Sequence, residues 1–387
     1  MRVLMISDVY FPRINGVSTS IQTFQRELTA LGHEITLIAP EYGPGDETPG
    51  WIHRIPSRRV LFDPEDRMMK REPIFALTDV MKQKDFDLIH IQTPFVAHYA
   101  GIELSRRLNI PRIETYHTHF EEYLYHYLPW SPRPLTRFVT RWFNRRQCNE
   151  MDALVVPSTA MIKVLDDYGI ERPVEIIATG LEEGFFTPGD GARFRARYGI
   201  HRERPLLVHI GRVAHEKNID FLLHMLSILV RTMPEVLLVI AGEGPAADHL
   251  HNLTRSLKLE NNVLFVGYLD RETMLKDCYN AGDAFVFASK TETQGLVLLE
   301  AMAQGVPVVS ISALGTADIL ESRRGAVVAA EDIDEFSART AAVLQDPALR
   351  SELGMQAQDF AREWSARAYA VKMASLYETT ALNYRLN

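Results

Sequence analysis

The chain has little of what several other classes of protein depend on. Among its 387 residues only two are cysteines, Cys148 and Cys278, which excludes a disulfide framework and offers no metal-type spacing. No apolar run reaches the roughly 18 residues that a membrane-spanning helix needs. The first eight residues turn acidic too soon for a signal peptide. We therefore expect a cytoplasmic protein without disulfides.

Basic residues are fewer than acidic ones. Asp and Glu number 50 against 42 Lys and Arg, a formal net charge of −8, which argues against nucleic acid as a partner. Hydrophobic residues make up 46% of the chain and charged residues 24%, so the composition is that of an ordinary globular protein.

Short apolar runs alternate with longer amphipathic stretches along the whole chain. Most runs are apolar at every position, as in parallel strands that are buried on both faces. The alternation predicts repeated βα units, and therefore an α/β protein with doubly wound parallel sheets. The predicted strands span residues 3–7, 35–39, 88–92, 112–117, 153–158, 174–179, 206–211, 236–242, 263–268, 284–289, 306–311 and 325–329.

One sheet of that many strands would be unusually wide, so two Rossmann-like domains are expected. The turn-rich stretch from Glu182 to Gly191 separates them. We predict an N-terminal domain over 1–187 and a C-terminal domain over 188–364, with a final helix over 365–387 that packs back on the first domain. The domains would face each other across a cleft lined by the carboxyl ends of the strands.

A single glycine follows the first predicted strand. Gly16 stands just before a helix that is expected to run to about Leu31. Glycine there lets a ligand approach the backbone, and a helix N-terminus favours a phosphate group. The alternative is a plain strand-to-helix turn capped by Ser18.

The corresponding loop of the second domain carries two cations. Arg212 offers a planar fork of donors to a phosphate group, and Lys217 offers a point charge. Asn218 would cap the helix that follows. A solvated loop with an Arg–Glu pair is the alternative, but basic residues at the carboxyl end of a strand favour a phosphate site.

Two glutamates, Glu292 and Glu300, stand eight residues apart on either side of a predicted helix start. Backbone N–H groups at a helix start attract anions, and one carboxylate can accept from two adjacent sugar hydroxyls. A nucleotide sugar presents both features. The alternatives are a capping acid plus an exposed helical Glu, or the acid and nucleophile of a glycosidase. The glycosidase would leave the phosphate-type loops without a role.

A histidine ends one of the predicted strands of the first domain. His117 would point into the cleft, where it can hydrogen-bond a sugar or an acceptor hydroxyl. His119 and nearby glutamates suggest a metal, but two histidines two residues apart, with no third ligand at a set spacing, do not fit a metal site.

Residues 129–150 contain a basic amphipathic helix. Its apolar face consists of Leu135, Phe138, Val139, Trp142 and Phe143, and its basic residues are Arg133, Arg137, Arg141, Arg145 and Arg146. No acidic residue lies between 131 and 147, which is typical of a helix on a membrane surface. The alternative is a helix that packs this apolar face on the sheet and leaves Arg in water.

These motifs, in this order, resemble the retaining glycosyltransferases of family 4, which have the GT-B fold. The resemblance covers nearly the whole chain and rests on the Gly16 loop, His117, the loop from Gly211 to Lys217, and the Glu292–Glu300 pair. Most of the family has Glu-Gly-Phe-Gly where this chain has Glu-Thr-Gln-Gly. That variant is similar to the branch of diacylglycerol glucosyltransferases, sulfolipid synthases and GDP-mannose-dependent mannosyltransferases.

The resemblance implies an acceptor-binding N-terminal domain, a nucleotide-sugar-binding C-terminal domain, retention of configuration and no metal or other cofactor. His117 and Glu292 would be the catalytic residues at the sugar, and Glu300 would hold the ribose diol. The remaining donor-binding residues would be Gly16, Arg212, Lys217, Thr293, Gln294, Gly295 and Leu296.

We therefore expect an enzyme that moves a hexose from a nucleotide sugar, UDP-glucose before GDP-mannose, to a membrane lipid such as diacylglycerol. It would act peripherally at the inner face of the cytoplasmic membrane. The residues expected at the membrane or acceptor are Arg137, Arg141, Trp142 and Arg145. A soluble or polysaccharide acceptor, a non-catalytic nucleotide-sugar-binding protein and an epimerase of the same fold stay open as alternatives.

Overall fold

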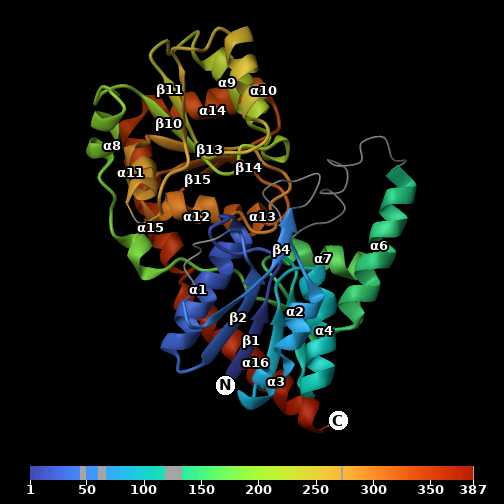
Figure 1. Ribbon diagram of the computed structural model, residues 1–387. Helices are drawn as coiled ribbons and strands as arrows, with labels where there is room; N and C mark the ends of the chain where they lie inside the picture. Colours follow the sequence, from blue (N-terminus) through green and yellow to red (C-terminus); the bar gives the residue numbers. More distant parts are fainter. Residues whose placement is uncertain (44–48, 60–66, 118–132, 272, 387) are drawn as a thin grey trace. The chain divides into compact units, whose positions relative to one another are not determined.

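The chain forms two compact units in the computed structural model, which describes residues 1–43, 49–59, 67–117, 133–271 and 273–386, with only the backbone of 133–138. Unit 1 comprises Met1–Gly180 and Ala366–Asn387, and unit 2 comprises Leu181–Ser365 (Figure 1). The change of unit at Gly180 comes earlier than the boundary expected at 187/188.

Hydrogen bonds explain why the residues just after Gly180 belong to unit 2. The N–H of Leu181 donates to the carbonyl of Trp364 at 2.7 Å. Farther on, the side chain of Gln304 donates to the carbonyl of Phe185 at 2.6 Å and accepts from the N–H of Gly189 at 2.7 Å. The turn-rich stretch is therefore held against unit 2 along its length.

Unit 1 is built on a seven-stranded parallel sheet of order β3-β2-β1-β6-β7-β8-β9, with a separate antiparallel pair, β4 and β5. The strands are β1 (Arg2–Ile6), β2 (Glu34–Pro40), β3 (Ile52–Ile55), β4 (Ser57–Arg59), β5 (Arg67–Met69), β6 (Leu88–Ile91), β7 (Arg112–Thr115), β8 (Ala153–Val156) and β9 (Val174–Ile176). The helices are α1 (Gly16–Ala30), α2 (Arg71–Ala76), α3 (Thr78–Gln83), α4 (Val96–Leu108), α6 (Arg133–Asn149), α7 (Thr159–Asp167) and α16 (Ala366–Leu386).

Unit 2 is built on a six-stranded parallel sheet of order β12-β11-β10-β13-β14-β15. The strands are β10 (Leu206–Ile210), β11 (Leu237–Ala241), β12 (Val263–Gly267), β13 (Ala284–Phe287), β14 (Val308–Ile311) and β15 (Ala326–Ala329). The helices are η1 (Glu183–Phe186), α8 (Gly191–Arg197), η2 (His215–Lys217), α9 (Ile219–Leu229), α10 (Ala247–Ser256), α11 (Met274–Ala281), α12 (Leu296–Ala303), α13 (Thr316–Leu320), α14 (Ile333–Gln345) and α15 (Pro347–Arg362).

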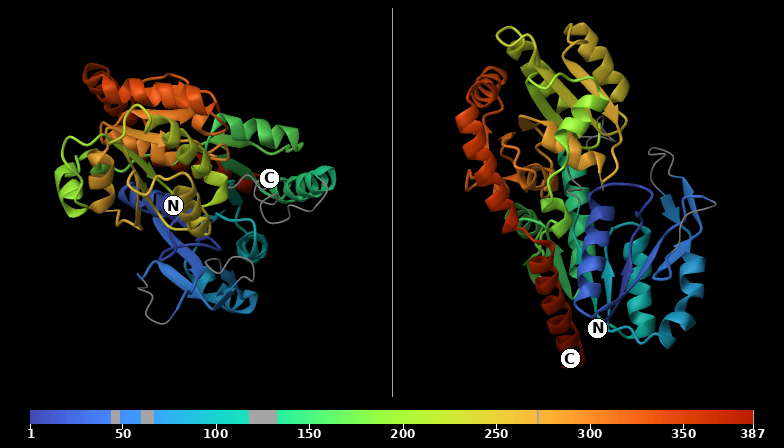
Figure 2. Two further views of the ribbon diagram at one scale, coloured as in Figure 1. Left: turned by 90° about the horizontal axis from the view of Figure 1, so that it is seen from above. Right: turned by 90° about the vertical axis from the view of Figure 1, so that its left-hand side faces the viewer.

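Helices cover both faces of each sheet, as Figure 2 shows. In β10, Leu206 and Val208 pack into one apolar cluster and Leu207 packs into the cluster on the opposite face. In β1, Val3 and Leu4 divide in the same way. Because alternate side chains enter two separate cores, most positions of these strands are apolar, and the prediction of two doubly wound parallel sheets is confirmed.

The C-terminal helix α16 belongs to unit 1, where it lies against α1. Ala370, Met373 and Tyr377 are buried in this contact. The Tyr377 hydroxyl lies 2.6 Å from Nδ1 of His90, at the centre of the sheet. None of the described helices combines the length and hydropathy needed to cross a lipid bilayer.

Candidate functional site

Strand order reverses next to the first strand of each sheet, between β1 and β6 in unit 1 and between β10 and β13 in unit 2. Loops that leave neighbouring strands at such a point turn to opposite faces and open a crevice where α/β proteins bind ligands. In unit 2 the loop with Arg212 follows β10 and the loop with Glu292 follows β13. The structure therefore brings these two predicted motifs together.

Lys217 and Glu292 make direct contact across the two loops of unit 2. The Lys217 ammonium lies 2.5 Å from Oε1 of Glu292, and both side chains are mostly buried, at 21% and 16% exposure. Burial alone would raise the pKa of Glu292. The charge of Lys217 and hydrogen bonds from Lys217 and Ser289 outweigh it, so the pKa is lowered and the carboxylate stays ionised.

Arg212 pairs with Glu216 at 3.6 Å. The Arg–Glu pair of the alternative reading is therefore present, in the same loop as Lys217. Asn218 stands at the N-cap position of α9, but its side chain does not cap the helix, contrary to prediction. It adopts a left-handed conformation with φ of 55°, and its side-chain amide donates to the carbonyl of Ala288 at 3.2 Å. Asn218 thus joins the two loops.

The start of α12 is shaped by two glycines. Gly295 precedes the helix with φ of +88°, a conformation that other residues rarely adopt. Gly315, after β14, packs so closely that a Cβ there would lie 2.0 Å from the carbonyl oxygen of Thr293. Its N–H donates to the carbonyl of Glu292 at 2.9 Å. Gln294 is buried, while Thr293 and Leu296 are half-buried.

Glu300 is buried inside unit 2, with both carboxylate oxygens engaged. Arg271 donates to Oε1 at 2.6 Å and the Tyr279 hydroxyl donates to Oε2 at 2.8 Å. A carboxylate offers about four acceptor positions, of which these two bonds use two. Sequence reasoning missed Arg271 and Tyr279 because neither lies in a motif.

His209, in β10, is a further residue that the sequence did not single out. It is buried, and its Nδ1 lies 3.1 Å from the carbonyl oxygen of Val286. Burial is the main cause that lowers its pKa to about 4, so the ring is neutral at pH 7. Its position near the end of a strand, in the same motif as Gly211 and Lys217, could have identified it as a candidate site residue.

Gly16 is the first residue of α1 in unit 1. The cap of this helix is Asn15, whose Oδ1 accepts from the N–H of Ser18 at 2.9 Å, so the alternative of a Ser18 cap is wrong. A Cβ at Gly16 would meet no heavy atom within 4 Å. The backbone at Gly16 thus faces open space.

Asp8, missed by the sequence reasoning, lies just after β1 in unit 1. Its carboxylate accepts from Thr93 Oγ1 at 2.8 Å and from the N–H of Ala97, at the start of α4. Burial raises the pKa of Asp8 to about 7, against these hydrogen bonds. Asp8 therefore titrates near neutral pH.

His117 follows β7, and its Nε2 lies 3.0 Å from Oε1 of Gln92, which follows β6. Burial lowers the pKa of His117 to about 4, so the ring is neutral at pH 7. His119 and the Glu and Tyr residues after it lie outside the described residues.

The described side chains of α6 leave part of its predicted apolar face exposed. The buried residues are Thr140, Asn144, Gln147 and Cys148, whereas Val139 is 49% and Trp142 56% exposed. The alternative in which the apolar face packs on the sheet therefore fails for Val139 and Trp142. The guanidinium of Arg141 lies 5.7 Å from the ring centroid of Tyr168, and Arg145 pairs with Glu171 at 3.5 Å. The side chain of Arg137 is outside the described set.

A hollow of about 420 Å³ lies between α4 and α6. Tyr99 and Ile102 of α4 face Trp142, Phe143 and Arg146 of α6 across it. Apolar surface with an arginine at its side is thus exposed on this part of unit 1.

Two family models match the chain: "Glycosyltransferase Family 4" over residues 14–185 and "Glycosyl transferases group 1" over 190–360. The alpha-monoglucosyldiacylglycerol synthase of Streptococcus pneumoniae is 33% identical over 80% of this chain and 71% of that protein. The sulfoquinovosyl transferase of Arabidopsis thaliana is 26% identical over 98% and 73%. A GDP-mannose-dependent alpha-mannosyltransferase of Mycobacterium tuberculosis is 28% identical over 84% and 82%.

Solved structures give the class of fold. Sucrose-phosphate synthase from Thermosynechococcus elongatus has a TM-score of 0.80 at 20% identity over 98% of both chains. HepE of Anabaena in complex with UDP-glucose has a TM-score of 0.75 at 17% identity over 98% of this chain and 100% of that chain. Two doubly wound sheets with these neighbours define the GT-B fold, and the two family models define a glycosyltransferase. The chain belongs to glycosyltransferase family 4, as its motifs had indicated.

Proposed function

We propose that the chain transfers a hexose, with retention of configuration, from a nucleotide sugar to a membrane lipid such as diacylglycerol. The contact between Lys217 and Glu292 supports the donor assignment. The bond to be broken joins a sugar to a diphosphate, so the residue that holds the sugar must lie beside the one that neutralises the phosphate. These two side chains are 2.5 Å apart.

In this proposal Arg212, Lys217 and the start of α12 stabilise the negative charge that grows on the departing diphosphate. Glu292 and the backbone from Thr293 to Leu296 hold the sugar hydroxyls, and Glu300 holds the ribose. The reaction needs no enzyme nucleophile, because a phosphate oxygen can take the proton of the acceptor hydroxyl. The neutral ring of His117 serves as a hydrogen-bonding group for the sugar and acceptor.

The donor base and sugar are proposed as UDP-glucose before GDP-mannose. The 33% identical relative is named as a monoglucosyldiacylglycerol synthase, and a 28% identical relative is named for GDP-mannose. Thermal shift with a panel of UDP- and GDP-sugars tests this order. UDP-glucose should raise Tm most, and Lys217→Ala should abolish the shift; a shift with GDP-mannose alone would reverse the assignment.

The exposed apolar residues of α6 support a lipid acceptor. A helix that buries Thr140 and Asn144 while leaving Val139 and Trp142 in solvent presents an apolar surface beside Arg side chains. That combination suits the interface of an anionic bilayer, where the acceptor lipid lies.

Co-sedimentation with vesicles of phosphatidylglycerol and diacylglycerol tests this surface. Val139→Ser/Trp142→Ser should weaken partition about tenfold or more, because a buried large apolar side chain is worth about 1.5–3 kcal/mol. The matched control is Val80→Ser/Leu382→Ser, which removes two residues of unit 1 that are 44% and 59% exposed. If the wild type does not bind vesicles, a soluble acceptor replaces the lipid in this account.

A further inference from the structure

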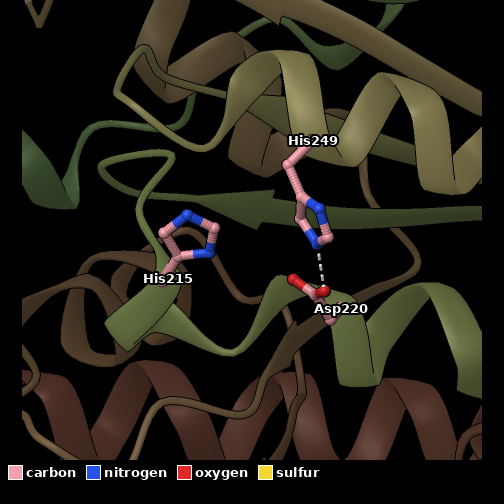
Figure 3. Close-up of side chains that lie close together, drawn as sticks. All are labelled: His215, Asp220 and His249. Atoms are coloured by element: carbon pink, nitrogen blue, oxygen red, sulfur yellow. Dashed lines mark hydrogen bonds and ion pairs between the residues drawn. The ribbon is translucent and has the colours of Figure 1, made fainter. Parts of the chain in front are cut away.

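A cluster of two histidines and an aspartate lies on unit 2 and includes none of the charged residues proposed to hold the donor. His215 comes from η2, Asp220 from the first turn of α9 and His249 from α10. Figure 3 shows His249 and Asp220 turned toward each other, with the ring of His215 beside them. Nε2 of His249 lies 2.5 Å from Oδ2 of Asp220, and the two imidazole centroids are 5.4 Å apart.

The ligand atoms of these side chains have the spacing of an open metal site. One nitrogen from each histidine and one carboxylate oxygen all lie within 4.8 Å of one another. Bonds of about 2.1 Å to a tetrahedral ion would bring them to roughly 3.4 Å apart. His215 and His249 are exposed, so side-chain rotation alone can close the remaining distance.

An ordinary surface ion pair would account for only part of this arrangement. Asp220 and His249 can pair without His215, and such an exposed pair contributes little to stability. The third group is the imidazole ring of His215 in η2, which the Asp220–His249 pair does not need. Three ligands from three elements leave one position open to water, as in zinc sites with three protein ligands.

We propose that His215, Asp220 and His249 bind a divalent transition-metal ion of the zinc type. Two imidazoles and one carboxylate suit Zn²⁺ and the neighbouring late transition metals, whereas Mg²⁺ and Ca²⁺ prefer oxygen ligands. The bound ion fastens η2 to α9 and α10. This turn ends with Lys217, which contacts Glu292, so the ion also restrains the loop that carries the donor-binding cation.

Isothermal titration of the untagged, metal-free chain with ZnCl₂ tests the site. We expect one site in the wild type, and His215→Gln, Asp220→Asn and His249→Gln should each weaken Zn²⁺ binding by more than about tenfold. Even loss of an indirect partner of a metal ligand costs about 10–100-fold. The matched control is His251→Gln, which changes another exposed histidine of α10 and should bind Zn²⁺ like the wild type.

Cobalt provides a readout of geometry. Co²⁺ in the wild type should give the intense visible absorption of a tetrahedral site, absent from His215→Gln and His249→Gln, while MgCl₂ in excess should leave the spectrum unchanged. The proposal is overturned if the wild type binds no Zn²⁺, if His215→Gln and His249→Gln bind it as tightly as the wild type, or if His251→Gln loses binding equally.

Discussion

At the scale of single residues, the proposed donor site depends most on Lys217. Its ammonium is mostly buried against Glu292, where a charge acts more strongly than in water. Lys217→Ala should lower kcat/KM, with a loss of transition-state stabilisation of roughly 2–4 kcal/mol. Lys290→Ala is the matched control, since Lys290 lies in the Glu292 loop but is 49% exposed and pairs with Glu331. Equal kinetics for Lys217→Ala and the wild type would remove Lys217 from the site.

Gly16 gives a test that separates ligand contact from folding. A Cβ there meets no heavy atom within 4 Å, so Gly16→Ala should not lower Tm. If a donor diphosphate approaches this backbone, the added methyl group should raise KM for the nucleotide sugar at least about tenfold, as expected from a loss of about 1.4 kcal/mol. An unchanged KM in a variant whose Tm is not lowered would show that Gly16 is only part of a turn.

Asp8 should make stability depend on pH in a direction opposite to most carboxylates. Its folded pKa of about 7 lies above its ordinary value of 3.8, so its contribution is full below about pH 4 and is lost as pH rises through 7. Asp8→Asn removes this loss. The variant should therefore gain Tm relative to the wild type between pH 5 and pH 8.

Two histidines of unit 1 act in the other direction. Burial lowers the pKa of His90 to about 3 and of His117 to about 4, so acidification below about pH 6.5 favours the unfolded chain. Both histidines are present in wild type and variant alike, so their contribution cancels in the difference. A Tm difference between the two proteins that does not change with pH would contradict the account of Asp8.

At the scale of elements, the loop before α12 depends on the loop after β14. Gly315→Ala would place a Cβ 2.0 Å from the carbonyl oxygen of Thr293, so the backbone that is proposed to hold the sugar must move. Donor affinity should fall by about tenfold or more, equal to about 1.4 kcal/mol. Gly184→Ala is the control in the same unit, because its Cβ would meet nothing within 4 Å. Calorimetry with UDP-glucose compares the two, and equal affinities would contradict this dependence.

The central strands could be predicted from the sequence because they are buried on both faces and most of their residues are therefore apolar. The short strands β3, β4 and β5 could not. Ile52–Ile55 contains His53 and Arg54, and β4 and β5 have only three residues each, too few for an apolar run or an alternation to show. Their pairing depends on tertiary contacts, which override local preference.

The loops of the site were predictable for a related reason. A glycine and charged residues directly after a buried strand indicate a ligand-binding loop, and this signal is local to the sequence. Partners from other elements have no such signal: Arg271 and Tyr279 reach Glu300 from separate positions in the chain. Likewise the periodicity of α6 identified its apolar face, but only tertiary packing decides that Thr140 and Asn144 are buried instead.

At the scale of the whole molecule, two units with the same kind of sheet carry different chemistry. In unit 2 the loops after β10 and β13 bring together Lys217 and Glu292, an ion pair that suits a charged donor. The corresponding edge of unit 1 holds the neutral ring of His117 and the weak acid Asp8, which suit a neutral hydroxyl acceptor. This difference supports the proposed division into a donor unit and an acceptor unit.

The most direct measurement is transfer of label from UDP-[¹⁴C]glucose to lipid extracted from vesicles that contain diacylglycerol. The wild type should form a labelled glycolipid, and Glu292→Gln, which keeps the shape of the side chain but loses its charge, should form at least about a hundredfold less, as expected from a loss of roughly 3 kcal/mol. No labelled lipid from the wild type, or equal product from Glu292→Gln, would contradict the account.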